Sequence, residues 1–183
     1  MMKKIPLPNK KYNIIYADPA WKTKYFKEKK DGLLSRNLPY STLTDNEIIN
    51  LPVKNITDEN SILFLWCIDS KIPILTSIME SWGFTFKAVG FVWGKQAKTT
   101  NGFNSTFSSY TRKTCEFCFI GTKGKYLVKK RSVEQLILKS KREHSRKPDC
   151  VRDRIVELCG DLPRIELFAR QKVDGWDCWG NEV

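Results

Sequence analysis

Short apolar runs, separated by segments with helical signals, dominate this sequence. The first run, YNIIYA at residues 12–17, is typical of a buried strand and is followed by a polar loop. Further runs that indicate strands lie at 61–68, 84–93, 114–121 and 164–169, with a weaker one at 134–138. Because strands that alternate with helices characterise α/β proteins, the sequence predicts a mostly parallel sheet flanked by helices.

Helices are expected between these strands, at 44–51, 70–82 and 148–160. Thr44 and Glu47 match a capping box at the start of the first helix. Ser70 is expected to cap the second helix, which Gly83 ends. No repeat, low-complexity tract or linker interrupts the 183 residues, so we expect one catalytic domain over residues 1–183.

Composition narrows the class of protein. Hydrophobic residues make up 41% and charged residues 28%, which argues against a disordered or collagen-like chain. No window approaches the ~18 uninterrupted apolar residues of a membrane span, and no signal peptide is evident. A cytoplasmic protein without a membrane partner is therefore expected. The net charge of +12 favours a nucleic-acid partner, although a solubility bias or a lysine-rich genome would also produce it.

Six cysteines raise the question of disulfides or metal. Cys67, Cys115 and Cys118 lie in apolar runs, where reduced, buried thiols are the more common outcome. Cys115 and Cys118 have the spacing of half a zinc site, but a second pair at ligand spacing is missing. Residues three apart on a strand also point to opposite faces. We therefore expect no metal.

The tetrapeptide Asp18-Pro19-Ala20-Trp21 follows the first apolar run directly. Proline cannot continue a sheet ladder, so Asp18 is expected at the carboxyl end of its strand, where α/β sheets bind ligands. A carboxylate there can accept hydrogen bonds from an amine, and an indole can stack on a flat ring. Adenine offers both groups. Four residues alone are a weak motif, and taken alone they favour an aspartate that caps a turn and a tryptophan that simply packs.

Longer segments extend this interpretation. In chain order they are YNIIYADPAW at 12–21, NLPYSTLTDNEIINLPV at 37–53, ILFLWC at 62–67, CEFCFIGTKG at 115–124, SRKPD at 145–149 and RIELFARQKVDGWDCWGNEV at 164–183. Together they resemble the MT-A70 family of adenine methyltransferases, in the form of a minimal phage or prokaryotic catalytic core. The resemblance implies a class I, Rossmann-like fold with permuted motif order. It also implies S-adenosylmethionine as cofactor and the exocyclic N6 amine of adenine as methyl acceptor.

The resemblance implies roles for particular residues. Asp18, Pro19 and Trp21 match the catalytic Asp-Pro-Pro-Trp motif, and Tyr40 matches an aromatic residue near the target base. Ala20 replaces the second proline, which adds backbone freedom but removes none of the polar groups. The matched cofactor-binding positions are Asp18, Lys147, Glu166, Arg170, Asn181 and Glu182.

Basic residues near this motif are candidates for binding nucleic acid. Lys22, Lys24 and Lys27 follow the catalytic motif, and Arg112 borders the polar loop 94–111 together with Glu116. Phe103, Phe107 and Tyr110 give this loop a composition suited to a lid that stacks on bases, or to a plain surface loop with its aromatic rings turned inward.

Two substrates and two roles stay open at this point. DNA is the favoured substrate, and RNA is the alternative because the same pocket would accept an unpaired adenine. The chain could also be a catalytically inactive, nucleic-acid-binding partner in a methyltransferase heterodimer. A homodimer is equally compatible with the sequence.

Overall fold

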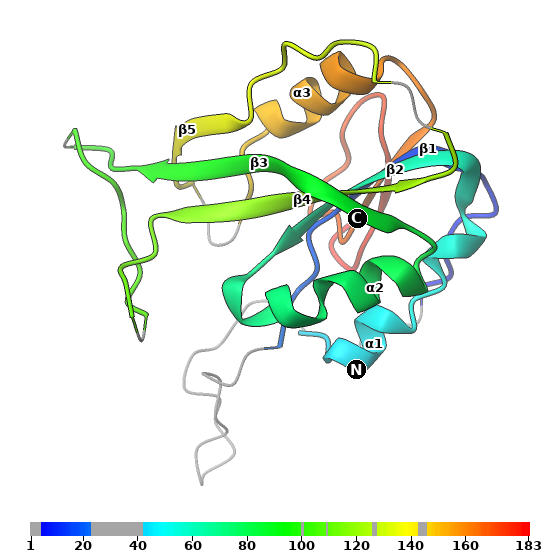
Figure 1. Ribbon diagram of the computed structural model, residues 1–183, viewed down its shortest axis with the longest axis horizontal. Helices are drawn as coiled ribbons and strands as arrows, with labels where there is room; N and C mark the ends of the chain where they lie inside the picture. The colour runs from blue at the N-terminus through cyan, green and yellow to red at the C-terminus, as the bar shows by residue number, and fades with distance from the viewer. Residues whose placement is uncertain (1–4, 23–41, 100, 109, 126–127, 143–145) are drawn as a thin grey trace, which may run out of the picture.

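One seven-stranded sheet organises the residues that the computed structural model describes, namely 5–22, 42–99, 101–108, 110–125, 128–142 and 146–183 (Figure 1). Its strands are β1 (Tyr12–Ala17), β2 (Thr57–Cys67), β3 (Thr85–Gln96), β4 (Cys115–Lys123), β5 (Leu136–Ser140), β6 (Arg164–Leu167) and β7 (Asp177–Trp179). Their spatial order is β5-β3-β4-β2-β1-β6-β7. The α-helices are α1 (Asp45–Ile49), α2 (Leu75–Ser81) and α3 (Cys150–Cys159), and 3-10 helices cover η1 (Val53–Asn55) and η2 (Asp69–Ile74).

The sheet is mostly parallel, as the sequence predicts. Neighbouring strands run parallel except where β4 pairs antiparallel with β2 and with β3. Strand β1 lies between β2 and β6, so the first strand of the chain pairs with one that begins at Arg164. The carboxyl ends of β1, β2, β3 and β6 therefore meet at one edge of the sheet.

Helices cover both faces of the sheet. Helices α1 and α2 lie on one face and α3 lies on the other (Figure 1). Within β1, Ile15 and Ala17 belong to the core cluster that contains α1 and α2, whereas Ile14 and Tyr16 belong to the cluster that contains α3. Successive side chains of a strand point to opposite faces, and both faces are buried here. This is the physical reason that the four consecutive residues 14–17 are all apolar.

Local helix signals are partly confirmed. The capping box at Thr44 is present, with the Thr44 N–H donating to Glu47 Oε2 at 2.8 Å. The single helix expected at 70–82 is wrong, because this segment divides into η2 and α2. Pro73 lies inside η2 and cannot donate a backbone hydrogen bond, and no side chain, Ser70 included, caps the start of η2. None of the helices in the described ranges has the length and apolar character that a membrane crossing requires.

Candidate active site

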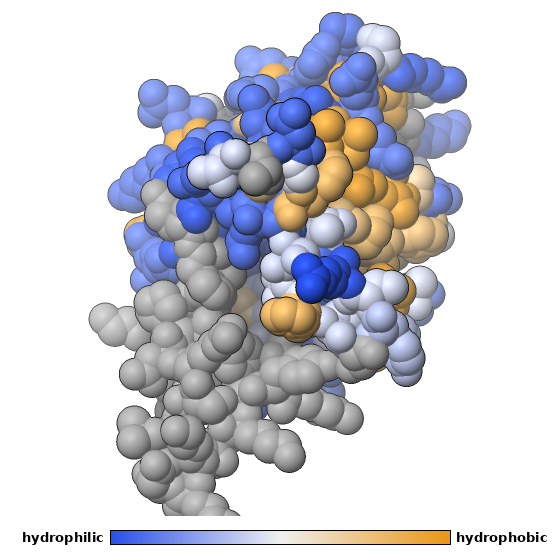
Figure 2. All heavy atoms as spheres, turned by 90° about the vertical axis from the view of Figure 1, so that its left-hand side faces the viewer, coloured by the Kyte–Doolittle hydropathy of each residue, from blue (hydrophilic) through white to orange (hydrophobic). Residues whose placement is uncertain are grey.

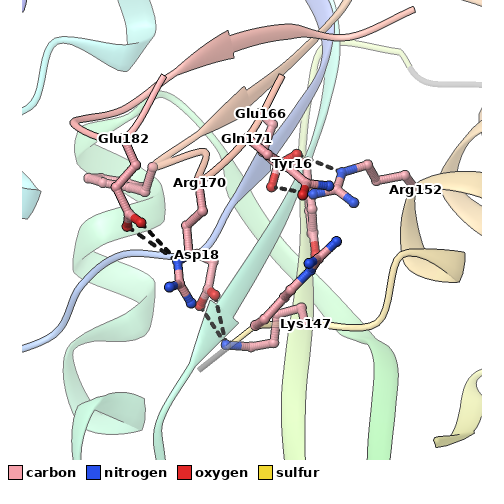
Figure 3. A pocket seen from close by; sticks show the side chains of 10 residues that line it. Tyr16, Asp18, Lys147, Arg152, Glu166, Arg170, Gln171 and Glu182 are labelled. Carbon is pink, nitrogen blue, oxygen red and sulfur yellow. Dashed lines mark hydrogen bonds and ion pairs between the residues drawn. The ribbon is translucent and has the colours of Figure 1, made fainter. Parts of the chain in front are cut away.

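Polar side chains gather where β1 and β6 end. The two strands are parallel neighbours with Ala17 aligned to Leu167, so the residues that follow each strand emerge together. A cavity of about 140 Å³ opens at this edge (Figure 3). Its lining combines charged and aromatic side chains, from Tyr16, Asp18, Arg146, Lys147, Arg152, Glu166, Phe168, Arg170, Gln171 and Glu182. Open α/β sheets bind their ligands at such a position.

Asp18 and Lys147 form an ion pair in this cavity. Lys147 Nζ lies 2.8 Å from Oδ1 and 2.7 Å from Oδ2 of Asp18. The lysine side chain is 11% exposed and the aspartate side chain 24%. Burial raises the pKa of Asp18, and the Lys147 ammonium opposes that rise. The pair thus places a largely desolvated carboxylate directly after β1.

Glu116, on β4, extends this pair into a chain of alternating charges. Its carboxylate lies 3.2 Å from Lys147 Nζ and 2.6 Å from Lys95 Nζ. Each ammonium also lies over an indole ring, Lys147 over Trp66 at 5.3 Å and Lys95 over Trp93 at 5.6 Å. Burial opposes ionisation of Glu116, but the two lysines outweigh it and lower its pKa to about 2. Burial also opposes the charge of Lys147, yet the carboxylates beside it raise its pKa above the ordinary value.

A second buried ion pair links β6 to α3. Arg152 Nε lies 2.6 Å from Glu166 Oε2, and Arg152 Nη2 lies 3.0 Å from Glu166 Oε1. The arginine side chain is 12% exposed and the glutamate side chain 9%, so this two-pronged contact is shielded from water. Burial opposes the charge of Arg152, but Glu166 raises its pKa above the ordinary value. The contact therefore fixes the orientation of the Glu166 side chain beside the cavity.

The chain turns sharply after β6. Phe168 has a φ of 62°, a left-handed conformation that costs a residue other than glycine about 1–2 kcal/mol. Past this turn, Arg170 Nε lies 3.2 Å from Glu182 Oε1 across the cavity lining. Gly180 permits the close approach of the two segments, because a Cβ atom there would lie 2.4 Å from the Ala169 carbonyl oxygen.

Comparison with known proteins decides the family. A model of the MT-A70 family matches residues 12–182. The chain belongs to the MT-A70 family. It is 36% identical over 193 residues to the type II methyltransferase M.MunI of Mycoplasma sp, a match that covers 97% of this chain and 80% of that protein.

Matches to eukaryotic proteins extend over less of each relative. The chain is 26% identical to the N(6)-adenosine-methyltransferase catalytic subunit METTL3 of Homo sapiens, over 94% of this chain and 28% of METTL3. It is also 26% identical to a probable N(6)-adenosine-methyltransferase MT-A70-like protein of Oryza sativa, over 94% of this chain and 23% of the relative. MT-A70 proteins are Rossmann-like adenine N6 methyltransferases, so the expected fold, enzyme class and family are confirmed.

The structure brings together most residues that match the cofactor positions of MT-A70 proteins. Asp18 follows β1, Lys147 precedes α3, and Glu166, Arg170 and Glu182 come from β6 and the segments after β6 and β7. All five line the same cavity. The sixth expected position, at residue 181, is exposed and does not line it.

The remainder of the MT-A70 catalytic motif is buried. Pro19 is buried, and its carbonyl oxygen accepts a hydrogen bond from the Trp21 N–H at 2.9 Å. Trp21 is 7% exposed and belongs to the core cluster under α1 and α2. The sequence suggests instead an indole that is open for stacking on a base. A backbone bridge to Leu43 holds it there. In the described part of the chain, Trp21 Nε1 has no hydrogen-bond partner.

Two of the expected nucleic-acid residues, Lys22 and Arg112, do not line the cavity. Lys22 is exposed immediately after the motif, and Arg112 is exposed on the connection between β3 and β4. Tyr40, Lys24 and Lys27 lie outside the described residues.

Sequence reasoning missed lining residues such as Tyr16 and Arg152, and it missed the contact of Glu116 with Lys147. Tyr16 reads as core, and its hydroxyl indeed accepts a hydrogen bond from Trp66 Nε1 at 2.8 Å. Arg152 reads as one of many charges in a basic segment, and Glu116 as a residue that orients a loop. No local signal separates these side chains from solvated ones.

Within the described ranges, no group of three His, Cys, Asp or Glu residues is placed to hold a metal ion.

Proposed function

We propose that this chain, acting as one catalytic domain over residues 1–183, transfers a methyl group from S-adenosylmethionine to the N6 amine of adenine in DNA. The observation that carries the proposal is the Asp18 carboxylate at the end of β1, held beside a cavity with cations on its walls. The chain covers 80% of a type II methyltransferase, a class that modifies DNA, whereas it covers about a quarter of the N(6)-adenosine-methyltransferases.

The side chains around the cavity fit S-adenosylmethionine. Its amino-acid portion carries a carboxylate and an ammonium group, and the lining offers both cations and carboxylates. We assign Lys147 and Arg170 to the cofactor carboxylate and hydroxyls, Asn181 to the ribose, and Glu166 and Glu182 to neighbouring contacts. Bound S-adenosylmethionine supplies an electrophilic methyl group.

Asp18 and Pro19 prepare the acceptor amine. The nitrogen lone pair of adenine is delocalised into the ring, so acceptors for both amine hydrogens are needed to redirect it. A carboxylate has about four lone-pair sites, so Asp18 can accept one hydrogen while it retains Lys147. The Pro19 carbonyl accepts one bond from Trp21 and keeps a second lone pair for the other hydrogen. Positioning of this kind accounts for most of the catalysis in such a transfer.

The charge of the chain supports a nucleic-acid substrate. With a net charge of +12, and Lys22 exposed beside the catalytic motif, phosphates near the target base would be attracted. We assign Lys24 and Lys27, which follow the catalytic motif, and Arg112, which borders the loop 94–111, to the same backbone contacts. The match to MT-A70 proteins assigns Tyr40 to the target base. In duplex DNA the adenine must leave the stack, at a cost of a few kcal/mol.

An inactive partner subunit is the second candidate function. METTL3 is named as a catalytic subunit, a term that implies a further subunit, and we propose that this chain works in a homodimer or a heterodimer.

The six free cysteines of this chain support a cytoplasmic location, where thiols stay reduced.

Transfer of radiolabelled methyl from S-adenosylmethionine to matched DNA and RNA pools, followed by nucleoside analysis, tests the proposal. We expect label in N6-methyldeoxyadenosine, and Asp18→Ala to lower the rate by about 10²–10³-fold, as for other positioned hydrogen-bonding groups. Glu157→Ala is the control, since Glu157 lies on α3, pairs with Lys130 at the surface and does not line the cavity.

The outcomes separate the candidate functions. Label in N6-methyladenosine would assign RNA as the substrate. Full activity of Asp18→Ala would refute the mechanism. The absence of transfer to either pool, with no cofactor binding by calorimetry, would identify the inactive partner subunit.

A further inference from the structure

The connection between β3 and β4, residues 97–114 and termed the β3–β4 arm, projects from the sheet edge that carries Asp18. Strand β3 ends at this edge and the antiparallel β4 begins there. The described part of the arm has a defined backbone, since the Thr106 N–H donates to Lys113 at 3.0 Å and the Lys113 N–H donates back at 2.9 Å. Lys113 Nζ lies 2.8 Å from Asp69, which follows β2. The arm is thus anchored next to the candidate active site.

Two aromatic rings of the arm stand almost entirely in water. Phe107 is 87% exposed and Tyr110 is 97% exposed. The Arg112 guanidinium lies 5.5 Å from the centre of the Phe107 ring. Figure 2 views the side from which the arm projects and shows hydrophobic surface there among hydrophilic atoms. Single exposed apolar residues are common, but neighbouring exposed rings on one projecting segment are typical of a binding surface.

The charge of the arm indicates what covers these rings. Residues 97–114 contain Lys98, Arg112 and Lys113 and no Asp or Glu. Exposed rings combined with cations are the pattern by which proteins bind single-stranded nucleic acid, because every base offers a face for stacking and every phosphate a negative charge.

We infer that the β3–β4 arm binds unpaired bases of the substrate next to the adenine that is methylated. Phe107 and Tyr110 stack on the bases, and Lys98 and Arg112 contact the flanking phosphates. This inference rests on the proposed function, because the adenine must leave the duplex before it is methylated, which unpairs the base opposite it and exposes the faces of the adjacent bases.

Fluorescence anisotropy of a fluorescein-labelled oligothymidine tests the arm. Oligothymidine contains no adenine, so its binding does not depend on recognition of the target base, and the result stands even if the protein transfers no methyl group. We expect the double substitution Phe107→Ala and Tyr110→Ala, termed the alanine variant, to weaken binding of oligothymidine about tenfold or more. The control variant carries both Phe107→Tyr and Tyr110→Phe, so it retains both aromatic rings. We expect its affinity for oligothymidine to lie within about twofold of that of the wild type.

Two results would overturn the inference. The alanine variant could bind as tightly as the wild type, or the control variant could lose as much affinity as the alanine variant. If the alanine variant binds as tightly, a change in its molar mass by light scattering would assign the arm to a protein–protein contact. Both variants change exposed side chains, and thermal melting verifies that they fold.

Discussion

Replacing Glu116 with Gln tests the chain of alternating charges beside the cavity. The Glu116 side chain is only 25% exposed and lies 2.6 Å from Lys95 and 3.2 Å from Lys147. Gln has nearly the same shape but no charge, so the substitution removes the attraction with little change in packing. It leaves Lys95, whose side chain is 7% exposed, without this carboxylate. Breaking a buried pair on one side is strongly destabilising.

The pKa of Glu116 sets the size of the effect. Its value is about 2 in the folded protein, against an ordinary value of 4.5. The depressed pKa means that the folded state favours the charged carboxylate, which contributes about 3 kcal/mol to the free energy of unfolding at pH 7. The contribution is complete above pH 4.5 and is lost as pH falls toward 2, so that about 1 kcal/mol remains at pH 3.

Urea unfolding of the wild type and of Glu116→Gln, at pH 7 and at acidic pH, measures this contribution. We expect Glu116→Gln to lose about 3 kcal/mol at pH 7, or about 6–12 °C in Tm, and the difference to narrow on acidification. Asp69→Asn is the matched control. It removes an ion pair whose side chains are 36% and 48% exposed, which contributes about 0–1 kcal/mol. Equal losses in the two variants at pH 7, or a difference that is independent of pH, would refute the reasoning.

Three further substitutions or reactions test other parts of the structure. Tyr16→Phe leaves the buried Trp66 Nε1 without its acceptor, so we expect a loss of about 1–3 kcal/mol in urea unfolding; unchanged stability would contradict this. Gly180→Ala forces a Cβ atom against the Ala169 carbonyl oxygen, so we expect a lower Tm than that of the wild type. An equal Tm would show that the close approach is not required. Burial raises the pKa of Cys67 to about 12, so iodoacetamide should not alkylate it in the native protein at pH 8, whereas mass spectrometry should detect alkylation in urea.

Features that depend on neighbouring residues could be predicted from the sequence. The strand at 12–17, the capping box at Thr44 and the position of Asp18 at a strand end depend on residues only a few positions apart. The same local reasoning overlooked Pro73, which divides the segment 69–81 into two helices. It also overlooked β7, because three residues at 177–179 carry too short a pattern to indicate a strand.

Contacts between distant segments could not be predicted in this way. Lys147 lies 129 positions after Asp18, and the order of strands in the sheet brings the two together. Whether Glu116 faces solvent or two lysines, and whether Trp21 is open or packed in the core, depends on which surfaces the sheet and helices cover. A residue's own sequence neighbours contain no information on that burial. The motifs and their order therefore indicate an adenine methyltransferase of the MT-A70 family, whereas the folded chain establishes which charges lie within 4 Å of each other and away from water.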